Sequence, residues 1–443
     1  MPNPYLPLWE YIPDGEPRVF GDRVYVYGSH DNAGSDKFCD YKLKVWSAAI
    51  DDLSSWTCHG HIFHTRNDRD HTSDTFWTDC DLYAPDVVEK DGKYYLYAYI
   101  MNAKGCVAVS DTPEGPFKLI SQYRYNIPKG KEKDCFGRGW FIDPGVLVDE
   151  DGKVYIYCGY ERSFVVEINP DNMCEIMDGT YQDDIIPIEE PFMFFEACSP
   201  RKIKDTYYLI YSPRTGSRLV YATSKYPKGP FEYRGVIVDN GIDYPGGNNH
   251  GSICNINDQW YIFYHRMTNG TVMSRRACVE KIEIMADGTI LEVGMTSLGF
   301  EESLSPYKIT PAEIACVLKG GCFITEKNVT LRPITSITNG CIIGYKFFDF
   351  GKDCSSKTMK FSALIKGTGC KSNIKVLVDR YENGEEIGMC EICPDDGIYS
   401  AVVKNVTGRH ALYFVVEDSF GGCFTDMFKG RHLFEFESFV FMK

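Results

Sequence analysis

Five polar residues lead into five similar strand patterns, and their types and spacing make them the candidates for chemistry. They lie 11, 9, 12, 12 and 11 residues before an anchoring tyrosine, and they are Asp14, Asp86, Asp143, Glu196 and His250. Carboxylates that a fold brings together repel one another and shift one another's pKa values, which is common at functional sites. One acid can then stay protonated while another is ionised. Hydrolysis of a glycosidic bond by a general acid and a general base needs such a pair.

The same residues could instead serve turns or a metal ion. Aspartate is common in turns, so each acid could serve only the turn that precedes its strand. His250 and several aspartates could hold Ca²⁺ through oxygen atoms and water. The glycines of the segment PGGNNH, residues 245–250, would let the backbone approach such an ion or a ligand closely.

The elements that must position these residues are five copies of one strand pattern. Each copy joins a turn to aromatic and β-branched residues, as in DRVYVY, DGKYYLY, DGKVYIY, DTYYLIY and DQWYIFY. The anchoring tyrosines, Tyr25, Tyr95, Tyr155, Tyr208 and Tyr261, are 70, 60, 53 and 53 residues apart. This period fits one four-stranded blade per repeat, so the pattern predicts a five-bladed β-propeller whose equivalent positions converge on the central axis.

A second internal repeat supports the same fold class. The segment VAVSDTPEGPF at 107–117 matches VYATSKYPKGPF at 220–231, and both indicate a strand, a turn and the start of an outer strand. Almost no stretch keeps a period of 3.6 residues, so the chain is expected to be all-β with few, short helices.

The pattern changes between residues 300 and 320, which suggests a second domain. We expect a catalytic propeller over 1–305 and a β-sandwich of the jelly-roll kind over 320–443, where short alternating strands follow one another. No cluster of acids stands out in the second part, so it is expected to support the first part or to bind a ligand.

Two further residues, together with Asp86, are candidates for contacting a substrate. Trp77 precedes the segment of Asp86 and could lie near the channel mouth, although a place in the core is the plainer interpretation. Arg266 ends the fifth strand pattern, where it could donate to a sugar hydroxyl or remain a solvated charge. We expect Trp77, Asp86 and Arg266 to bind the substrate.

Composition limits the partners of the protein. The 443 residues are 44% hydrophobic and carry a formal net charge of −15, which suits a globular protein with a neutral ligand. Nucleic acids and anionic membranes attract basic surfaces, so neither is an expected partner. No protein partner is evident from the sequence.

The N-terminus and the cysteines suggest a cytoplasmic protein. The first residues, MPNPYLPLWEYIPDG, lack the basic and apolar regions of a secretory signal, although a chain whose signal had been removed would look the same. The 18 cysteines are scattered, and one C-x-x-C motif, Cys390 and Cys393, is weak as a metal or redox site.

Four segments resemble the motifs of glycoside hydrolase family 43. They are the turn of Asp14, FIDPG at 141–145, FEA at 195–197 with the following Arg201 and Lys202, and NHGS at 249–252. The resemblance covers about residues 3–300. It implies a five-bladed propeller of inverting glycosidases that act on polymers containing arabinose and xylose.

The resemblance also implies roles for individual residues. Asp14 resembles the general base that activates water, Asp143 the carboxylate that tunes pKa values and orients substrate, and Glu196 the general acid. His250 resembles the axial histidine that often sits near a water-bound Ca²⁺. The chain has Tyr83 where many relatives have tryptophan before Ala-Pro, so sugar stacking at that position departs from the family.

The residues beyond 320 resemble a carbohydrate-binding module of family 6, through GYKFFDFG at 344–351 and HALYF at 410–414. Such a module would bind sugar or help to shape the active site.

Together these patterns predict an inverting exo-glycosidase for hemicellulose-derived oligosaccharides. The first choice is an α-L-arabinofuranosidase that removes arabinofuranosyl side chains from arabinoxylan- or arabinan-derived oligosaccharides, and the second is a β-D-xylosidase. A sugar-binding propeller without catalysis and a calcium-dependent scaffold are alternatives of other classes, but three acids are present. Inversion predicts that the carboxyls of Asp14 and Glu196 face each other across about 6.5–9.5 Å.

Overall fold

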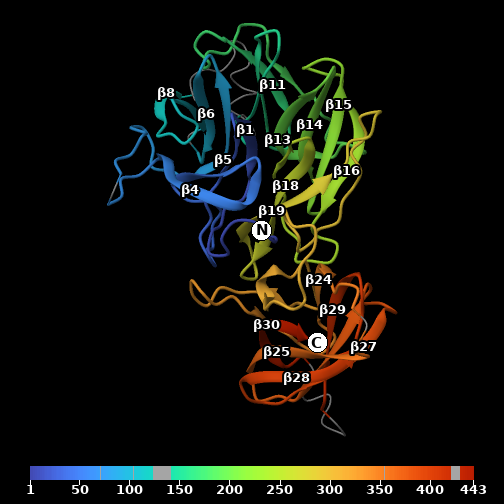
Figure 1. Cartoon of the computed structure of the whole chain (residues 1–443). Helices are drawn as coiled ribbons and strands as arrows, with labels where there is room; N and C mark the ends of the chain where they lie inside the picture. Colours follow the sequence, from blue (N-terminus) through green and yellow to red (C-terminus); the bar gives the residue numbers. More distant parts are fainter. Residues whose placement is uncertain (70, 103, 123–140, 354, 421–429) are drawn as a thin grey trace.

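The chain forms a five-bladed β-propeller followed by a β-sandwich, which confirms the fold class predicted from the sequence (Figure 1). In this computed structural model the described residues are 1–443 except 70, 103, 123–140, 354 and 421–429. Among them the only helical element is a single 3₁₀ turn, η1, over Ala312–Ile314. No helix of the described part is long and apolar enough to span a membrane.

Among the described residues, four blades have four strands and the fifth has three, and neighbouring strands in each blade are antiparallel. The strands of blades 1 and 2 are β1 Glu16–Phe20, β2 Arg23–Gly28, β3 Lys42–Ala49, β4 Asp52–His64, β5 Leu82–Lys90, β6 Lys93–Ile100, β7 Lys104–Ser110 and β8 Lys118–Gln122. Those of blades 3 and 4 are β9 Gly145–Val148, β10 Val154–Cys158, β11 Phe164–Ile168, β12 Gln182–Asp183, β13 Phe194–Ile203, β14 Thr206–Pro213, β15 Arg218–Ser224 and β16 Glu232–Asp239. Blade 5 contains β17 Ser252–Ile256, β18 Gln259–Thr268 and β19 Thr271–Ile282.

The anchoring tyrosines occupy the same place in every blade. Tyr25, Tyr95, Tyr155, Tyr208 and Tyr261 lie on the second strands, β2, β6, β10, β14 and β18. Many aromatic residues of these strands are buried in the apolar layers between blades, where large rings fill the space between twisted sheets. The repeat seen at 107–117 and 220–231 falls on the third strands, β7 and β15, as expected.

The innermost strands of the blades, β1, β5, β9, β13 and β17, surround the axis, and side chains link them directly. Arg18 of β1 donates to both carboxylate oxygens of Asp86 on β5, at 3.0 and 2.6 Å, and to the Val146 carbonyl of β9 at 3.0 Å. Arg201 of β13 donates to Glu16 of β1 and to the Ile253 carbonyl of β17. We call this set of side chains the axial network. It spans all five blades with two cations and two carboxylates.

The C-terminal part forms two packed antiparallel sheets. One sheet has the order β22-β23-β30-β25-β28 with β20 also paired to β30, and the other has the order β21-β24-β29-β26-β27. Their bounds are β20 Thr310–Pro311, β21 Val317–Lys319, β22 Phe323–Ile324, β23 Ile334–Thr335, β24 Ile342–Asp349, β25 Thr358–Gly367, β26 Ser372–Val378, β27 Glu385–Ile392, β28 Gly397–Lys404, β29 Arg409–Asp418 and β30 Phe434–Met442. These sheets therefore begin at Thr310, ahead of residue 320.

The propeller and the sandwich share one apolar core. It joins residues of blades 4 and 5, such as Tyr221 and Tyr264, to residues of the sandwich, such as Tyr345 and Phe439. Polar contacts reinforce this junction, since Tyr11, close to the first candidate acid, donates to Glu326 at 2.8 Å. The sandwich therefore packs against the propeller beside the segment that carries Asp14.

Candidate active site

One structurally equivalent position in each blade lies at the entrance of the innermost strand. In each blade, one residue of the innermost strand pairs with the anchoring tyrosine of the second strand. The equivalent position is four residues before that paired residue, and it is occupied by Asp14, Ala84, Asp143, Ala197 and His250. Asp14 and Asp143 adopt left-handed backbone, with φ of 57° and 52°. Non-glycine residues seldom do so, and such strained positions concentrate at functional sites. The structure thus brings Asp14, Asp143 and His250 together at one end of the axis.

Asp14 is buried and fully engaged by cationic and polar groups. Arg275 of β19 donates to its Oδ1 at 2.8 Å, and the Ser29 hydroxyl donates to its Oδ2 at 2.6 Å. The backbone N–H of Asp14 donates to Nδ1 of His265 at 3.3 Å. Arg275 is itself held by two further bonds to the Asp31 carboxylate, at 2.8 and 3.0 Å. The side chain of Asp14 is therefore fixed in orientation as well as in charge.

Glu196 enters the site through an irregularity of β13. The pairing of β13 with β14 shifts register between Phe194 and Glu196 and again between Glu196 and Ser199. Bulges of this kind redirect a side chain and are frequent next to active sites. In blade 4 the equivalent entrance position is Ala197, and the bulge offers Glu196 from the neighbouring position instead. Glu196 is half-buried, whereas Asp14 and Asp143 are buried.

Asp143 and His250 complete the set. The Nδ1 atom of His250 lies 3.6 Å from Asp143 Oδ2 and 3.9 Å from Asp14 Oδ1. The Ala197 backbone N–H donates to Asp143 Oδ2 at 3.2 Å, which ties this carboxylate to the residue that follows Glu196. His250 thus lies between two carboxylates, and Asp143 connects blade 3 to the Glu196 bulge.

The electrostatic environment separates the pKa values of the acids. Burial alone would raise the pKa of Asp14, but Arg275, His250, His265 and the Ser29 hydroxyl hold this pKa below its usual value. Burial and the nearby Asp14 charge raise the pKa of Glu196 to about 7. Burial and the charges of Glu196 and Asp14 also raise the pKa of Asp143 to about 7, against the opposing effect of His250. Near neutral pH, Asp14 is therefore ionised, whereas Glu196 and Asp143 can carry a proton.

Asp86 does not join these acids, contrary to the expectation from its spacing. Its offset of 9 residues from the tyrosine, against 11 for Asp14, places it two residues further along its strand. It is equivalent to Glu16 and belongs to the axial network, where it is buried and bound by Arg18 and by the Val146 N–H at 2.7 Å. Its carboxylate oxygens link neighbouring blades of the propeller, and the structure does not support the predicted contact with substrate.

Arg266 also points away from the site, so its predicted contact with substrate needs correction. It is fully buried and donates to the Ala315 and Glu313 carbonyls of the sandwich side, each at 2.8 Å. Successive residues of a strand face opposite sides. On β18 the residue that faces Asp14 is therefore the neighbouring His265, whose Nε2 contacts the Asn248 carbonyl at 3.1 Å.

Trp77 lies in the segment between β4 and β5 and packs against the apolar core of blades 1 and 2. It is half-buried, and its indole nitrogen is buried without a hydrogen-bond partner in the described part of the chain. This position matches the plainer interpretation, a core tryptophan. Another aromatic residue, Phe195, directly precedes Glu196 in the chain, and its ring centroid is 4.9 Å from that of Tyr160.

The groups that surround Asp14 were not predicted from the sequence. They are Ser29, Asp31, His265 and Arg275. A usable signal existed for Arg275, because the pair Arg275-Arg276 interrupts a strand whose other residues are mostly apolar, and charges at buried strand positions need partners. The partners themselves lie 244 and 261 residues away in sequence, so only the fold identifies them.

The surroundings of His250 offer few direct ligands for a calcium ion. In the described part of the chain, Asp14, Asp143 and His250 do not bring three ligand atoms within 4.8 Å of one another, so they form no carboxylate cage. The side-chain oxygens of Asn248 and Asn249 are buried without hydrogen-bond partners among the described residues. Amide oxygens and water are ligands that calcium accepts. This donor set fits an ion held by His250 and mostly by water.

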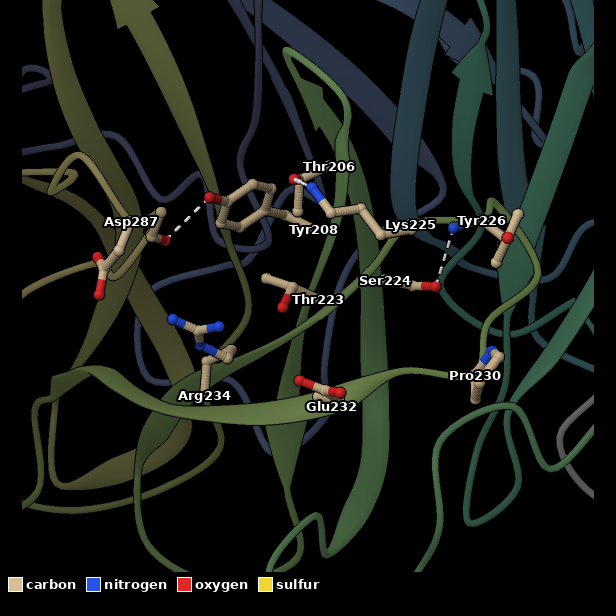
Figure 2. Close-up of a pocket in the computed structure, with 11 residues that line it drawn as sticks. Thr206, Tyr208, Thr223, Ser224, Lys225, Tyr226, Pro230, Glu232, Arg234 and Asp287 are labelled. Carbon is tan, nitrogen blue, oxygen red and sulfur yellow. Dashed lines mark hydrogen bonds between the residues drawn. The ribbon is translucent and has the colours of Figure 1, made fainter.

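A separate pocket of about 370 Å³ lies on blade 4, at the opposite end of the strands (Figure 2). Its wall includes Tyr208, Glu232, Arg234 and Asp287. Since β13 begins at the site and ends at Ile203, the start of β14 at Thr206 belongs to the far face of the propeller. This pocket is therefore unrelated to the acids at the axis.

Comparison with known proteins gives concordant matches. The family model described as "Glycosyl hydrolases family 43" matches residues 11–290. A "Xylosidase/arabinosidase" of Thermoclostridium stercorarium is 38% identical over 474 aligned positions, which cover 94% of this chain and 96% of that protein. An "Arabinoxylan arabinofuranohydrolase" of Paenibacillus polymyxa is 27% identical, with coverage of 95% and 73%.

Solved structures share the fold. A family 43 arabinoxylan arabinofuranohydrolase from Bacillus subtilis, in complex with cellotetraose, aligns with a TM-score of 0.56 at 24% identity, over 100% of this chain and 97% of its own. A family 43 β-xylosidase/α-arabinofuranosidase from a compost microbial metagenome, in complex with xylotriose and in a calcium-free form, aligns with a TM-score of 0.55 at 29% identity. The second alignment covers 66% of this chain and 99% of that structure.

Proposed function

Because the chain belongs to glycosyl hydrolase family 43, we propose that it is an inverting exo-α-L-arabinofuranosidase. Its substrates are oligosaccharides from arabinoxylan or arabinan, from which it removes arabinofuranosyl side chains. One observation carries the proposal. Asp14 and Glu196 come from different blades to one end of the axis, and their environments shift their pKa values in opposite directions. Such a divergence identifies an acid and a base.

The reaction uses each group in the state that its surroundings favour. Ionised Asp14 takes a proton from water, and the water oxygen forms a bond to the anomeric carbon on the face opposite the leaving group. The glycosidic C–O bond breaks as protonated Glu196 gives its proton to the departing oxygen. Single displacement inverts the anomeric configuration. Proton exchange with solvent then restores both carboxyl groups.

Asp143 and His250 act through these two groups. The Glu196 charge raises the pKa of Asp143, and because such an interaction is mutual, an ionised Asp143 favours the protonated form of Glu196. His250 lies between Asp143 and Asp14 and orients both carboxylates. His250, with water, would hold a calcium ion at the axis, and such an ion would supply a fixed positive charge near the acids.

A β-D-xylosidase is the second candidate. The relative with 38% identity is called a xylosidase/arabinosidase, and the two pentoses are similar in size and shape. The related structure with 29% identity is described as a β-xylosidase/α-arabinofuranosidase, and it holds xylotriose. Both candidates share the same acid and base, so they differ only in how the walls of the pocket fit the sugar.

The sandwich that follows the propeller is assigned to support or to sugar binding. We assign catalysis to residues 1–305, which contain all four residues of the site, and we assign 320–443 to a module of the family 6 kind. The extensive shared core supports a structural role at the least. Neutral oligosaccharides agree with the acidic net charge of the whole chain.

The experiment that tests this function compares two aryl glycosides and follows the stereochemistry. Release of nitrophenol from the α-L-arabinofuranoside is expected to exceed release from the β-D-xyloside. Proton NMR at early times should show the sugar product with inverted anomeric configuration. Retention of configuration, or no hydrolysis of either glycoside, would contradict the proposal.

A further inference from the structure

A cluster of histidines lies at the end of β4, apart from the acids. Five of the nine histidines of the chain fall within residues 30–71, and three of these are on β4 itself. One side-chain nitrogen each of His61 and His64 and one carboxylate oxygen of Asp68 lie within 4.8 Å of one another. Two imidazoles and a carboxylate are a common ligand set for divalent transition metals.

A β-bulge brings the two histidines to one face. Residues three apart on a regular strand point to opposite sides. In the pairing of β3 with β4, however, Leu43 faces Phe63 and Lys44 faces His61, so Ile62 is an extra residue. The bulge reverses the alternation, and His61 and His64 therefore project from the same side of the sheet. The sequence alone, H-x-x-H in a strand, would have predicted opposite sides.

His64 lacks the hydrogen bonds that a buried imidazole normally makes. Its side chain is 1% exposed, and neither ring nitrogen has a hydrogen-bond partner among the residues that the structure describes. The Nδ1 atom lies 3.5 Å from Asp68 Oδ2. Leaving a buried polar group unpaired is costly, so such a group calls for a further ligand. Ligand atoms around a tetrahedral Zn²⁺ are about 3.3 Å apart, which small side-chain rotations would reach here.

Neighbouring groups supply what surrounds metal ligands in proteins. The His71 ring centroid lies 3.9 Å from that of His64, and His71 Nε2 contacts Asp74 Oδ2 at 2.9 Å. The same Asp74 oxygen accepts the His64 backbone N–H at 2.8 Å. A carboxylate bonded to a histidine fixes the ring and strengthens it as a ligand. His71 is thus placed to serve as a fourth ligand or as a support.

Two of the cations near the cluster are paired with acids. Lys44 is neutralised by Glu10 at 3.0 Å, and Arg66 by Asp81 at 2.9 Å. Lys42 and Lys44 place positive charge near His61, and the Asp68 carboxylate is the group of the site that opposes it.

We propose that His61, His64 and Asp68 form a binding site for a divalent transition-metal ion such as Zn²⁺. Because the strands of blade 1 alternate in direction, β4 ends on the face where β1 begins, beside Asp14. The ion would join the end of β4 to the segment that runs from Thr65 to the start of β5. The site is structural, and it is separate from His250 and from the reaction.

Titration of the chelator-treated, full-length protein without a polyhistidine tag tests the proposal. Isothermal titration with Zn²⁺ should show one ion per chain, and saturation should raise the melting temperature, since the ion binds the folded state. His61 is exposed, so His61→Gln should leave the fold intact and weaken Zn²⁺ binding at least about 100-fold. Asp68→Asn and His64→Gln should act in the same direction.

His59→Gln is the matched control. His59 is on the same strand but contacts the Ser47 hydroxyl at 2.7 Å instead of the cluster, so its loss should leave Zn²⁺ affinity unchanged. His250→Gln should likewise keep the ion. The proposal is overturned if no stoichiometric binding occurs. Equal affinity in His61→Gln and His59→Gln would also overturn it, because the ion would then lie elsewhere.

Discussion

At the scale of single residues, the site depends on what each carboxyl group is bonded to. Asp14 and Glu196 are both carboxylic acids near one axis, yet an arginine and a hydroxyl contact the first, while no ion pair to the second is present among the described contacts. The difference in surroundings, and not the residue type, decides which group loses its proton at neutral pH.

Glu196→Ala and Asp14→Ala should differ in how their defects depend on the leaving group. Without Glu196, an oligosaccharide leaves slowly because nothing protonates its oxygen, whereas a nitrophenolate departs with little help. Without Asp14, both substrates suffer alike because the attacking water has no base. Losses of about 10²–10⁴-fold in kcat/KM are expected for the affected substrates. If Glu196→Ala loses no more on the oligosaccharide than on the aryl glycoside, Glu196 is not the acid.

Arg275→Lys should move the acidic limb of the pH profile upward. Arg275 helps to hold the pKa of Asp14 below its usual value, so weaker pairing raises this pKa and protonates the base at a higher pH. The measurement is kcat/KM against pH. Arg276→Lys is the control, because Arg276 contacts Tyr11 and Glu326 and not Asp14. An acidic limb that shifts equally in both variants would argue against this role of Arg275.

Asp143→Asn should move the basic limb downward. Glu196 must be protonated to act, and its pKa of about 7 sets where activity declines as pH rises. The Glu196 charge raises the pKa of Asp143, and because the interaction is mutual, removing the Asp143 charge should lower the pKa of Glu196. The basic limb of kcat/KM should therefore move to lower pH, and an unchanged limb would show that the two groups are not coupled.

At the scale of elements, the innermost strands set the positions of the acids, and small irregularities adjust them. Gly145, at the start of β9, lies against β13, because a Cβ there would be 2.2 Å from the Cys198 carbonyl oxygen. A side chain at 145 would push β9, which follows Asp143, away from β13, which carries Glu196.

Gly145→Ala should consequently lower both stability and activity. Overpacking of this kind costs about 1–3 kcal/mol of unfolding free energy, and the displaced strands would separate Asp143 from Glu196. Chemical denaturation and kcat on an aryl glycoside measure the two effects. Gly294→Ala is a matched control, because nothing lies within 4 Å of the Cβ position there. Similar behaviour of the two variants would contradict the close approach of β9 and β13.

The sequence was sufficient to predict the blades but not the registers within them. The five tyrosines identified all second strands, because one repeated pattern of aromatic residues marks each of them. Asp86 lies 9 residues before its tyrosine and Asp14 lies 11 before its own, but in the sequence alone a shorter turn between the two strands would give the same difference as a shift of two positions along the strand. Bulges, as at Glu196, change a spacing by one residue and leave no clear trace in composition.

The same limit explains why the sequence pointed to Arg266, and not to its neighbour His265, as a residue of the site. They are neighbours in one strand, and the choice between them depends on which face meets the axis. We predicted the arginine from the sequence because its guanidinium could donate hydrogen bonds to a sugar. In the structure, however, β18 directs the histidine toward Asp14 and the arginine toward the sandwich. Long-range partners such as Asp31 and Arg275 become apparent only after the ring closes.

At the scale of the whole molecule, the propeller and the sandwich are linked by buried charge. Arg266 has its acceptors at residues 313 and 315, and Arg276 is paired with Glu326 at 3.3 Å. Both arginines are fully buried. A propeller without the sandwich would keep these cations and their bonds to Asn3 and Tyr11, but it would lose the Glu326 carboxylate and the two carbonyl acceptors.

A chain ending at residue 305 should therefore be strongly destabilised. Breaking a buried charge pair by removing one partner typically costs about 3–5 kcal/mol, and the shared apolar core would be exposed as well. Calorimetry of the full chain should show the two parts unfolding in one transition, and the shortened chain should melt far lower or precipitate. An isolated propeller that melts at the temperature of the full chain would contradict this linkage.

The axial network has a consequence for traffic through the molecule. Arg18 and Arg201 reach from blade to blade beneath the acids, and their bonds to Asp86 and Glu16 bridge the axis between the innermost strands. With the axis bridged in this way, we expect a sugar chain to reach the acids from one end and not to thread through the propeller. Such access suits the removal of terminal or branching sugars. The released sugar is then expected to leave by the route through which the substrate entered, so that product and substrate compete for the same approach to the acids.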